Sequence, residues 1–108
     1  MEGSNLLRLP RTMLKCAIEL RVGDRKVMLN QAVGNVSVTG IFLEAEPLPL
    51  GAPVHLKIAT VPPFELDGVI RNSHLAGIGI EFTAISAPGR KGLHKLIAEL
   101  APREILAA

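Results

Sequence analysis

Residues 35–40 have the sequence NVSVTG and run directly into residues 41–44, IFLE. Strands favour β-branched and aromatic residues, so Asn35, Ser37 and Gly40 need a separate explanation in a segment between two expected strands. One interpretation is structural, because glycine and asparagine supply the backbone angles of a β-bulge or a tight crossover. The other is functional, with short hydrogen-bonding groups displayed on a sheet for a ligand. Spacing alone favours the structural interpretation.

The segments around this stretch alternate apolar and polar residues, which is typical of half-buried antiparallel strands. Every even-numbered position from Leu14 to Val22, for example, is apolar. Turn signals occur at residues 23–24, 47–51 and 61–63. The pattern predicts six strands, over residues 12–22, 26–34, 41–46, 52–59, 64–71 and 77–82.

After residue 86 the apolar period becomes that of a helix. Its apolar stripe, at positions i, i+3, i+4 and i+7, consists of Leu93, Leu96, Ile97 and Leu100. Ser86 can cap the helix, Pro88 is tolerated in its first turn, and residues 101–102 are its expected end, although residues 104–106 can add a turn. The order predicts a mainly β fold, a six-stranded antiparallel barrel with a C-terminal α-helix on or across one end.

A chain of 108 residues has room for one domain. We expect residues 1–10 to form a flexible N-terminal arm, in which Pro10 disfavours helix at Leu9. Residues 11–101 then form the barrel and its helix, and residues 102–108 a C-terminal tail.

The net charge is only +2, but the basic residues are unevenly distributed. Residues 8–26 contain six basic side chains against two acidic ones. This asymmetry suggests an anionic partner of modest size. Aromatic residues make up 3 % of the chain, with no Trp or Tyr, which argues against a DNA- or RNA-binding protein that stacks bases on aromatic side chains.

Cys16 is the single cysteine, so it cannot form an internal disulfide, and its place among apolar positions suggests a core residue. We expect a reducing, cytoplasmic setting. No apolar run approaches the ~20 residues of a membrane span, which predicts no membrane insertion. Residues 1–5 lack the features of a signal peptide.

The histidines and the nearest carboxylate pair do not suggest a reactive site. His55 falls on the polar face of an expected strand, His74 in a loop and His94 on the helix surface, and each fits a solvated histidine better than a ligand. Glu65 and Asp67 share one strand face and are interpreted as solvated charges.

Motifs for catalysis and for metal binding are also absent from the sequence. It contains no His-Glu-x-x-His or Cys-x-x-Cys pair for zinc and no Walker-type glycine loop. Ser37 has no activating base nearby in sequence, although folding can bring one to it. We therefore expect no enzymatic activity, no metal and no cofactor.

Taken in order, these features resemble the PilZ domain family over residues 8–100. The motif Asn35-x-Ser37-x-x-Gly40 is similar to the family's Asp/Asn-x-Ser-x-x-Gly, and residues 41–44 continue in the family's manner. Residues 47–56 look like the beginning of its next strand, and residues 77–82 look like its last strand before the helix. The resemblance implies a six-stranded β-barrel of a kind that commonly binds cyclic di-GMP, a bacterial second messenger.

The chain departs from the family's second ligand motif, Arg-x-x-x-Arg before the first strand. Arg11 matches the second arginine, but Leu7 stands four residues earlier and the available arginine is Arg8. The spacing Arg11-x-x-x-Lys15 would place a point charge inside the expected strand, instead of a planar guanidinium. The resemblance implies a cyclic di-GMP site that comprises Arg8, Arg11, Asn35, Ser37 and Gly40.

Each of these residues has a chemical role in that site. A guanidinium can pair with guanine O6 and N7, hold a phosphate or stack on a base, so Arg8 and Arg11 can close over the ligand. Asn35 and Ser37 can bond a guanine edge, while Gly40 lets the backbone turn or approach. Losing one arginine contact costs about 1–3 kcal/mol, or about 5- to 150-fold in affinity.

Two functional interpretations remain. In the favoured one, the chain is a single-domain cyclic di-GMP receptor whose arm changes conformation on binding and signals through a protein partner. In the other, it is a PilZ-fold adaptor that does not bind cyclic di-GMP and works through contacts of Leu6, Leu7, Leu9 and residues 105–106. The sequence identifies neither partner nor pathway, and leaves open whether the chain forms a homodimer.

Overall fold

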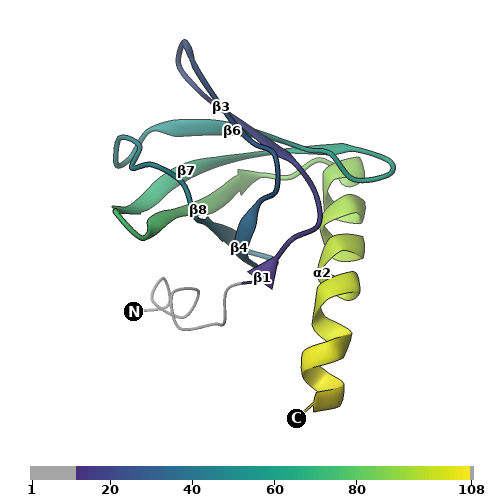
Figure 1. Cartoon of the computed structure of the whole chain (residues 1–108). Coiled ribbons are helices and arrows are strands. Elements are labelled where there is room, and N and C mark those ends of the chain that lie inside the picture. Colours follow the sequence, from purple (N-terminus) through teal and green to yellow (C-terminus); the bar gives the residue numbers. More distant parts are fainter. Residues whose placement is uncertain (1–11, 108) are drawn as a thin grey trace.

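The computed structural model describes residues 12–107, and the side-chain surroundings of residues 13–100. The chain forms a curled antiparallel sheet with one long C-terminal helix (Figure 1). The expected mainly β fold with a C-terminal helix is confirmed. The arm expected over residues 1–10, which includes Arg8, lies outside the described residues, and so does Arg11.

The strands are β1 (Thr12–Met13), β2 (Ile18–Val22), β3 (Arg25–Leu29), β4 (Val33–Val36), β5 (Gly40–Leu43), β6 (Pro53–Ile58), β7 (Phe64–His74) and β8 (Gly77–Ala84). Their order in the sheet is β1-β4-β5-β8-β7-β6-β2-β3, and every neighbouring pair is antiparallel. Within the described residues β1 and β3 do not pair, so the sheet curls into an open barrel.

The strand expected over residues 12–22 is divided by a corner. The amide of Leu14 donates to the carbonyl of Ala32 (2.9 Å), and the amide of Ala32 donates to the carbonyl of Cys16 (3.1 Å). Lys15, between them, has a φ of 61°, a left-handed conformation that is uncommon outside glycine. The chain therefore leaves β4 at this point and crosses to β6, so the expectation that Lys15 lies inside a strand is wrong.

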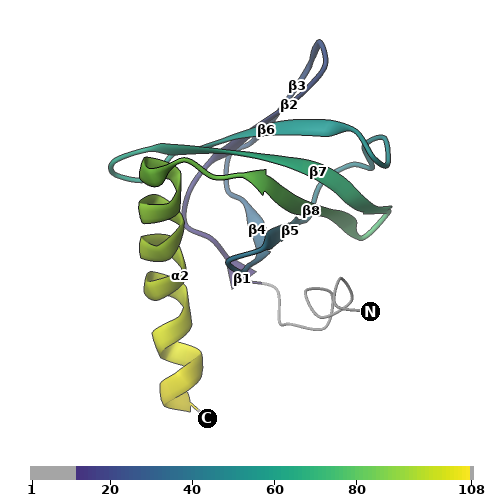
Figure 2. The same cartoon turned by 180° about the vertical axis from the view of Figure 1, so that it is seen from behind.

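The strand expected over residues 26–34 is divided as well. β3 pairs with β2 in a hairpin at one edge of the sheet, whereas β4 pairs with β1 and β5 near the other edge. These two divisions account for eight strands in place of six. The hairpin of β2 and β3 projects from the sheet in both views (Figures 1 and 2).

The core is aliphatic and lies on the concave face of the sheet. Its most deeply buried side chains include Leu14, Ile18, Leu20, Leu43, Leu56, Leu66, Ile70 and Ile78. The alternation seen in the sequence correctly predicted the buried faces of β2, β6 and β7, whereas β5 and the first half of β8 are buried on both faces. Cys16 belongs to this core, and burial, followed by the negative charge of Glu99, raises the pKa of its thiol. A protonated, buried thiol is chemically inert.

Helix α2 (Ala87–Ala107) stands across one end of the curled sheet, and its last turns extend past the strands (Figures 1 and 2). Ser86 caps its start as expected, because the amide of Gly89 donates to the Ser86 hydroxyl (3.2 Å). Leu93 and Leu96 anchor the helix in the core. The helix continues past its expected end at residues 101–102. Within residues 12–107, no helix is both long and apolar enough to cross a membrane.

Gly92 sets how closely α2 approaches β7. A Cβ at this position would overlap the ring of Phe64, which is itself buried. We expect Gly92→Ala to lower the free energy of unfolding by about 1–3 kcal/mol, as overpacking does, although alanine is the better helix former by about 1 kcal/mol. Urea denaturation measures the change.

The control is Ala98→Gly at an exposed position of the same helix, where propensity alone should cost about 1 kcal/mol. We therefore expect Gly92→Ala and Ala98→Gly both to destabilise the protein, although one replaces glycine by alanine and the other alanine by glycine. A stabilising effect of Gly92→Ala would contradict the close packing of α2 on Phe64.

Candidate functional site

Residues 35–40 join β4 to β5 in a tight hairpin. Asn35 pairs with Phe42 and Val36 with Ile41, and the amide of Ser37 donates to the carbonyl of Gly40 (2.9 Å). Only Val38 and Thr39 remain to form the turn. The amide of Phe82 donates to the carbonyl of Thr39 (2.9 Å), which ties the turn to β8. The hairpin is therefore fixed at its tip as well as along its strands.

The hydroxyl of Ser37 organises this turn. Its Oγ accepts a hydrogen bond from the amide of Thr39 (3.2 Å) and lies 3.1 Å from the Thr39 hydroxyl and 3.4 Å from the Gly40 carbonyl oxygen. A serine oxygen has one donor and two acceptor positions, and the three contacts within the turn can occupy all of them. Ser37 is half-buried and Thr39 exposed, so a ligand can replace the contact between the two hydroxyls.

Gly40 is required by a neighbouring strand. Its backbone is not left-handed, and a Cβ there would lie 2.5 Å from the carbonyl oxygen of Ile80 on β8. The glycine was expected to let the backbone turn or approach a ligand. The structure instead shows a close approach between β5 and β8, so the last residue of the motif has a packing role.

Asn35 belongs to a row that crosses four strands on the outer face of the sheet. It pairs with Phe42, Phe42 pairs with Gly79, and Gly79 pairs with Asn72 on β7. Asn35 is 6 % exposed and Phe42 is 1 % exposed, although Phe42 is not part of the core on the concave face. The polar residue that begins the motif is thus buried at the base of the hairpin.

A second row contains charged residues that the sequence analysis did not identify. Gly40 pairs with Glu81, and the Nε of Arg71 lies 2.7 Å from a carboxylate oxygen of Glu81. Arg71 follows the buried Ile70 and so lies on the outer face, and the irregularity between Ile70 and Asn72 leaves it as the extra residue in the β7–β8 register. In the sequence, Arg71 showed only as a polar-face residue, because its place beside the motif depends on the strand order.

Three of the five expected site residues are therefore together on one hairpin: Asn35, Ser37 and Gly40. Arg8 and Arg11 lie outside the described residues. Lys15, which restored the arginine spacing, lies beyond Ala32 and faces α2, whereas Ser37 is at the opposite end of β4. Lys15 is thus poorly placed to substitute for an arginine of the motif.

The sequence between residues 8 and 99 matches a family model described as the PilZ domain. The chain belongs to the PilZ domain family. The match includes Arg8 and Arg11 as well as the hairpin at residues 35–40. This family comprises ligand-binding and adaptor domains, and the match indicates no catalytic family.

A PilZ domain of known structure has the same fold. It is the crystal structure of the PilZ domain of CeSA from a cellulose synthesizing bacterium, with a TM-score of 0.63 and 14 % sequence identity. The alignment covers 85 % of this chain and 98 % of that one. Likeness at this identity is evidence for the fold alone. A search of curated proteins found no match.

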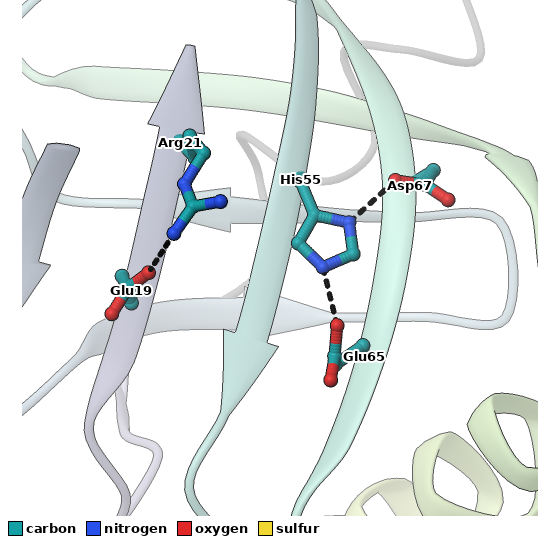
Figure 3. Close-up of polar contacts among 5 residues, drawn as sticks. All are labelled: Glu19, Arg21, His55, Glu65 and Asp67. Atoms are coloured by element: carbon teal, nitrogen blue, oxygen red, sulfur yellow. Dashed lines mark hydrogen bonds and ion pairs between the residues drawn. The ribbon is translucent and has the colours of Figure 1, made fainter. Parts of the chain in front are cut away.

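A second polar cluster lies on the outer face of β6 and β7. Nδ1 of His55 is 2.6 Å from a carboxylate oxygen of Asp67, and its Nε2 is 2.5 Å from one of Glu65 (Figure 3). Glu65 and Asp67 are exposed and His55 is partly exposed, as expected, but the β6–β7 register also brings the three side chains together, which the sequence pattern did not predict. The hydrogen bonds, that of Asp67 first, raise the pKa of His55. Among the described residues, no group of three or more His, Cys, Asp or Glu side chains forms a metal site.

This cluster predicts a pH dependence of stability. Because the folded-state pKa of His55 is raised above its ordinary value of 6.5, its contribution is complete below that value and is lost as pH rises through the raised pKa. We expect urea denaturation to show lower stability at pH 8.5 than at pH 6. Arg21 and Lys57 also lie on this face, opposite His55 and Glu65.

The variant His55→Gln should reduce the difference between the two pH values, whereas His94→Gln, on the exposed face of α2, should leave it unchanged. An equal pH dependence in His55→Gln and the wild type would show that this cluster does not contribute.

Proposed function

We propose that this PilZ domain is a cytoplasmic receptor that binds cyclic di-GMP on the outer face of the β4–β5 hairpin. Binding changes the conformation of the N-terminal arm and signals to a protein partner. The observation that carries the proposal is the register of β1, whose Thr12 pairs with Gly34, the residue before Asn35. The arm is thus joined to the sheet beside the motif.

Covalent geometry supports a contact between the arm and the hairpin. The Cα of Arg11 is about 3.8 Å from that of Thr12, and Arg8 is at most about 14 Å from it along the chain. Both guanidinium groups can therefore reach the face that carries Asn35 and Ser37.

The exposed chemistry of this face fits a guanine nucleotide. Ser37 can exchange its contact with the Thr39 hydroxyl for a hydrogen bond to the edge of a guanine, and Arg71 offers a further guanidinium close to the turn. Glu81 now neutralises Arg71, and a bound phosphate can take the place of that carboxylate. Arginine also provides a stacking surface, which this face needs because its one aromatic ring, Phe42, is buried.

Calorimetric titration with cyclic di-GMP tests the proposal and the role of Ser37 together. We expect saturable heat with the wild type and an affinity about 2- to 10-fold lower for Ser37→Ala, which is the worth of one neutral hydrogen bond. The control is Thr60→Ala, which removes a hydroxyl that donates to the Pro62 carbonyl in a distant turn (2.8 Å). Equal weakening by both variants would contradict a specific contact of Ser37.

The departure at Leu7 favours a second candidate, a PilZ adaptor that does not bind cyclic di-GMP. Its proposed contact residues, Leu6, Leu7, Leu9 and residues 105–106, lie outside the described side chains. Partners that bind equally well with and without the nucleotide would support it.

A further inference from the structure

A groove separate from the hairpin lies between α2 and the β6–β7 connection, residues 59–63. Its volume is about 510 Å³. Both views show that this connection reaches the N-terminal end of the helix (Figures 1 and 2). The groove, called the α2 groove below, has an apolar lining of the exposed Val61 and Pro62 and the buried Phe64 and Leu96. Val61 is 86 % exposed, so the apolar surface is open to a partner.

Three lysines from two separate parts of the chain line this groove. Lys91 and Lys95 lie one turn apart on α2, and Lys15 comes from the corner between β1 and β2. Glu99 is the one acidic side chain among the lining residues. Within the described part of the chain, Lys15 and Lys91 have no carboxylate partner. The lining therefore carries an excess of two positive charges.

The backbone holds two of these lysines in place. Lys15 has a left-handed conformation between Leu14 and Cys16, both of which bond the backbone of Ala32. A non-glycine residue in this conformation is retained where the surrounding structure determines it. Nζ of Lys95 donates to the carbonyl of Val61 (3.0 Å), which uses one of its three protons and links the helix to the connection.

We propose that the α2 groove binds an acidic amphipathic segment of a protein partner. One apolar side chain of that segment packs against Val61 and Pro62, and its carboxylates pair with Lys15, Lys91 and Lys95. Charge complementarity identifies this occupant, because an apolar surface with a basic rim matches a segment with the opposite charge.

The chemistry of the α2 groove argues against a nucleotide as its ligand. Lysine supplies point charges and no planar fork for a guanine edge, and Phe64 is only 6 % exposed, so it offers little ring surface for stacking. The proposal is therefore independent of cyclic di-GMP binding, and its test contains no nucleotide.

The probe is a synthetic peptide of paired Glu and Leu residues, titrated into the ¹⁵N-labelled full chain. We expect amide shifts around Val61, Lys91 and Lys95, and an affinity that falls as salt rises. The double variant Lys91→Glu/Lys95→Glu should weaken binding by about 10-fold or more, whereas Lys57→Glu, on the outer face of β6, should not. The substituted residues Lys57, Lys91 and Lys95 are all exposed, so these variants are expected to fold.

Two further probes identify the class of ligand. A peptide with Lys in place of Glu is expected not to bind, and inorganic phosphate or glutarate is expected to bind far more weakly than the acidic peptide. Equal binding of the Lys peptide, equal binding of the small anions, shifts located outside the α2 groove, or no binding of the acidic peptide at millimolar concentration would each overturn the proposal.

Discussion

Gly34→Ala is expected to lower the free energy of unfolding by about 3 kcal/mol or more. Gly34 is buried in β4, and a Cβ there would overlap the carbonyl oxygen of Phe42 on β5. Because that oxygen belongs to the backbone of a paired strand, no side-chain rotation relieves the overlap, and the strands must separate. Thermal and urea denaturation of the two proteins measure the loss.

The matched control is Gly79→Ala, a buried glycine in the adjacent pair of strands. There the nearest atom to a Cβ is the side-chain amide nitrogen of Asn72, at 3.0 Å, and a side chain can move. We expect less than half of the effect of Gly34→Ala. Wild-type stability of Gly34→Ala would contradict the register of β4 against β5, and with it the position of Asn35.

Arg11→Ala is expected to weaken cyclic di-GMP binding by about 5- to 150-fold, which corresponds to the loss of about 1–3 kcal/mol from one guanidinium contact. Arg11 adjoins Thr12, which pairs with the residue before the motif, so its side chain can reach the outer face of the hairpin. Calorimetric titration of the wild type and the variant gives the ratio of Kd values.

Lys15→Ala is the control, because Lys15 preserves the four-residue spacing from Arg11 but faces the α2 groove. It should bind cyclic di-GMP as the wild type does. Loss of binding in Lys15→Ala with no loss in Arg11→Ala would contradict the proposal, because it would show that Lys15, and not Arg11, contacts the ligand. Arg8→Ala then shows whether the shifted arginine takes part.

The buried faces of β2, β6 and β7 could be predicted from the sequence, but the ends of the strands could not. The even positions from Leu14 to Val22 point inward on both sides of the corner, because side chains continue to alternate between the two faces when the partner strand changes. The corner itself depends on the backbone bonds of Ala32 to Leu14 and Cys16, which join residues far apart in the sequence. No local pattern identifies Ala32 as the pivot.

The candidate site shows the same division between local and long-range information. The motif at residues 35–40 marks a hairpin in which Ser37 and Gly40 have structural roles, and its functional interpretation stays a prediction. The reason for Gly40 is the Ile80 carbonyl on β8, and Arg71 comes near the turn through the order β5-β8-β7. His55 meets Glu65 and Asp67 only through the β6–β7 register. Pairing between distant strands is the information that the alternation of residues does not contain.

The most direct test of the proposed receptor is an NMR titration of the ¹⁵N-labelled full chain with cyclic di-GMP. The proposal predicts saturable shifts of the amides of Ser37, Thr39 and Arg71 on the outer face of the hairpin, with little change at Val61 and Lys95 in the α2 groove. An unchanged spectrum at micromolar protein and ligand, or shifts confined to the α2 groove, would contradict it.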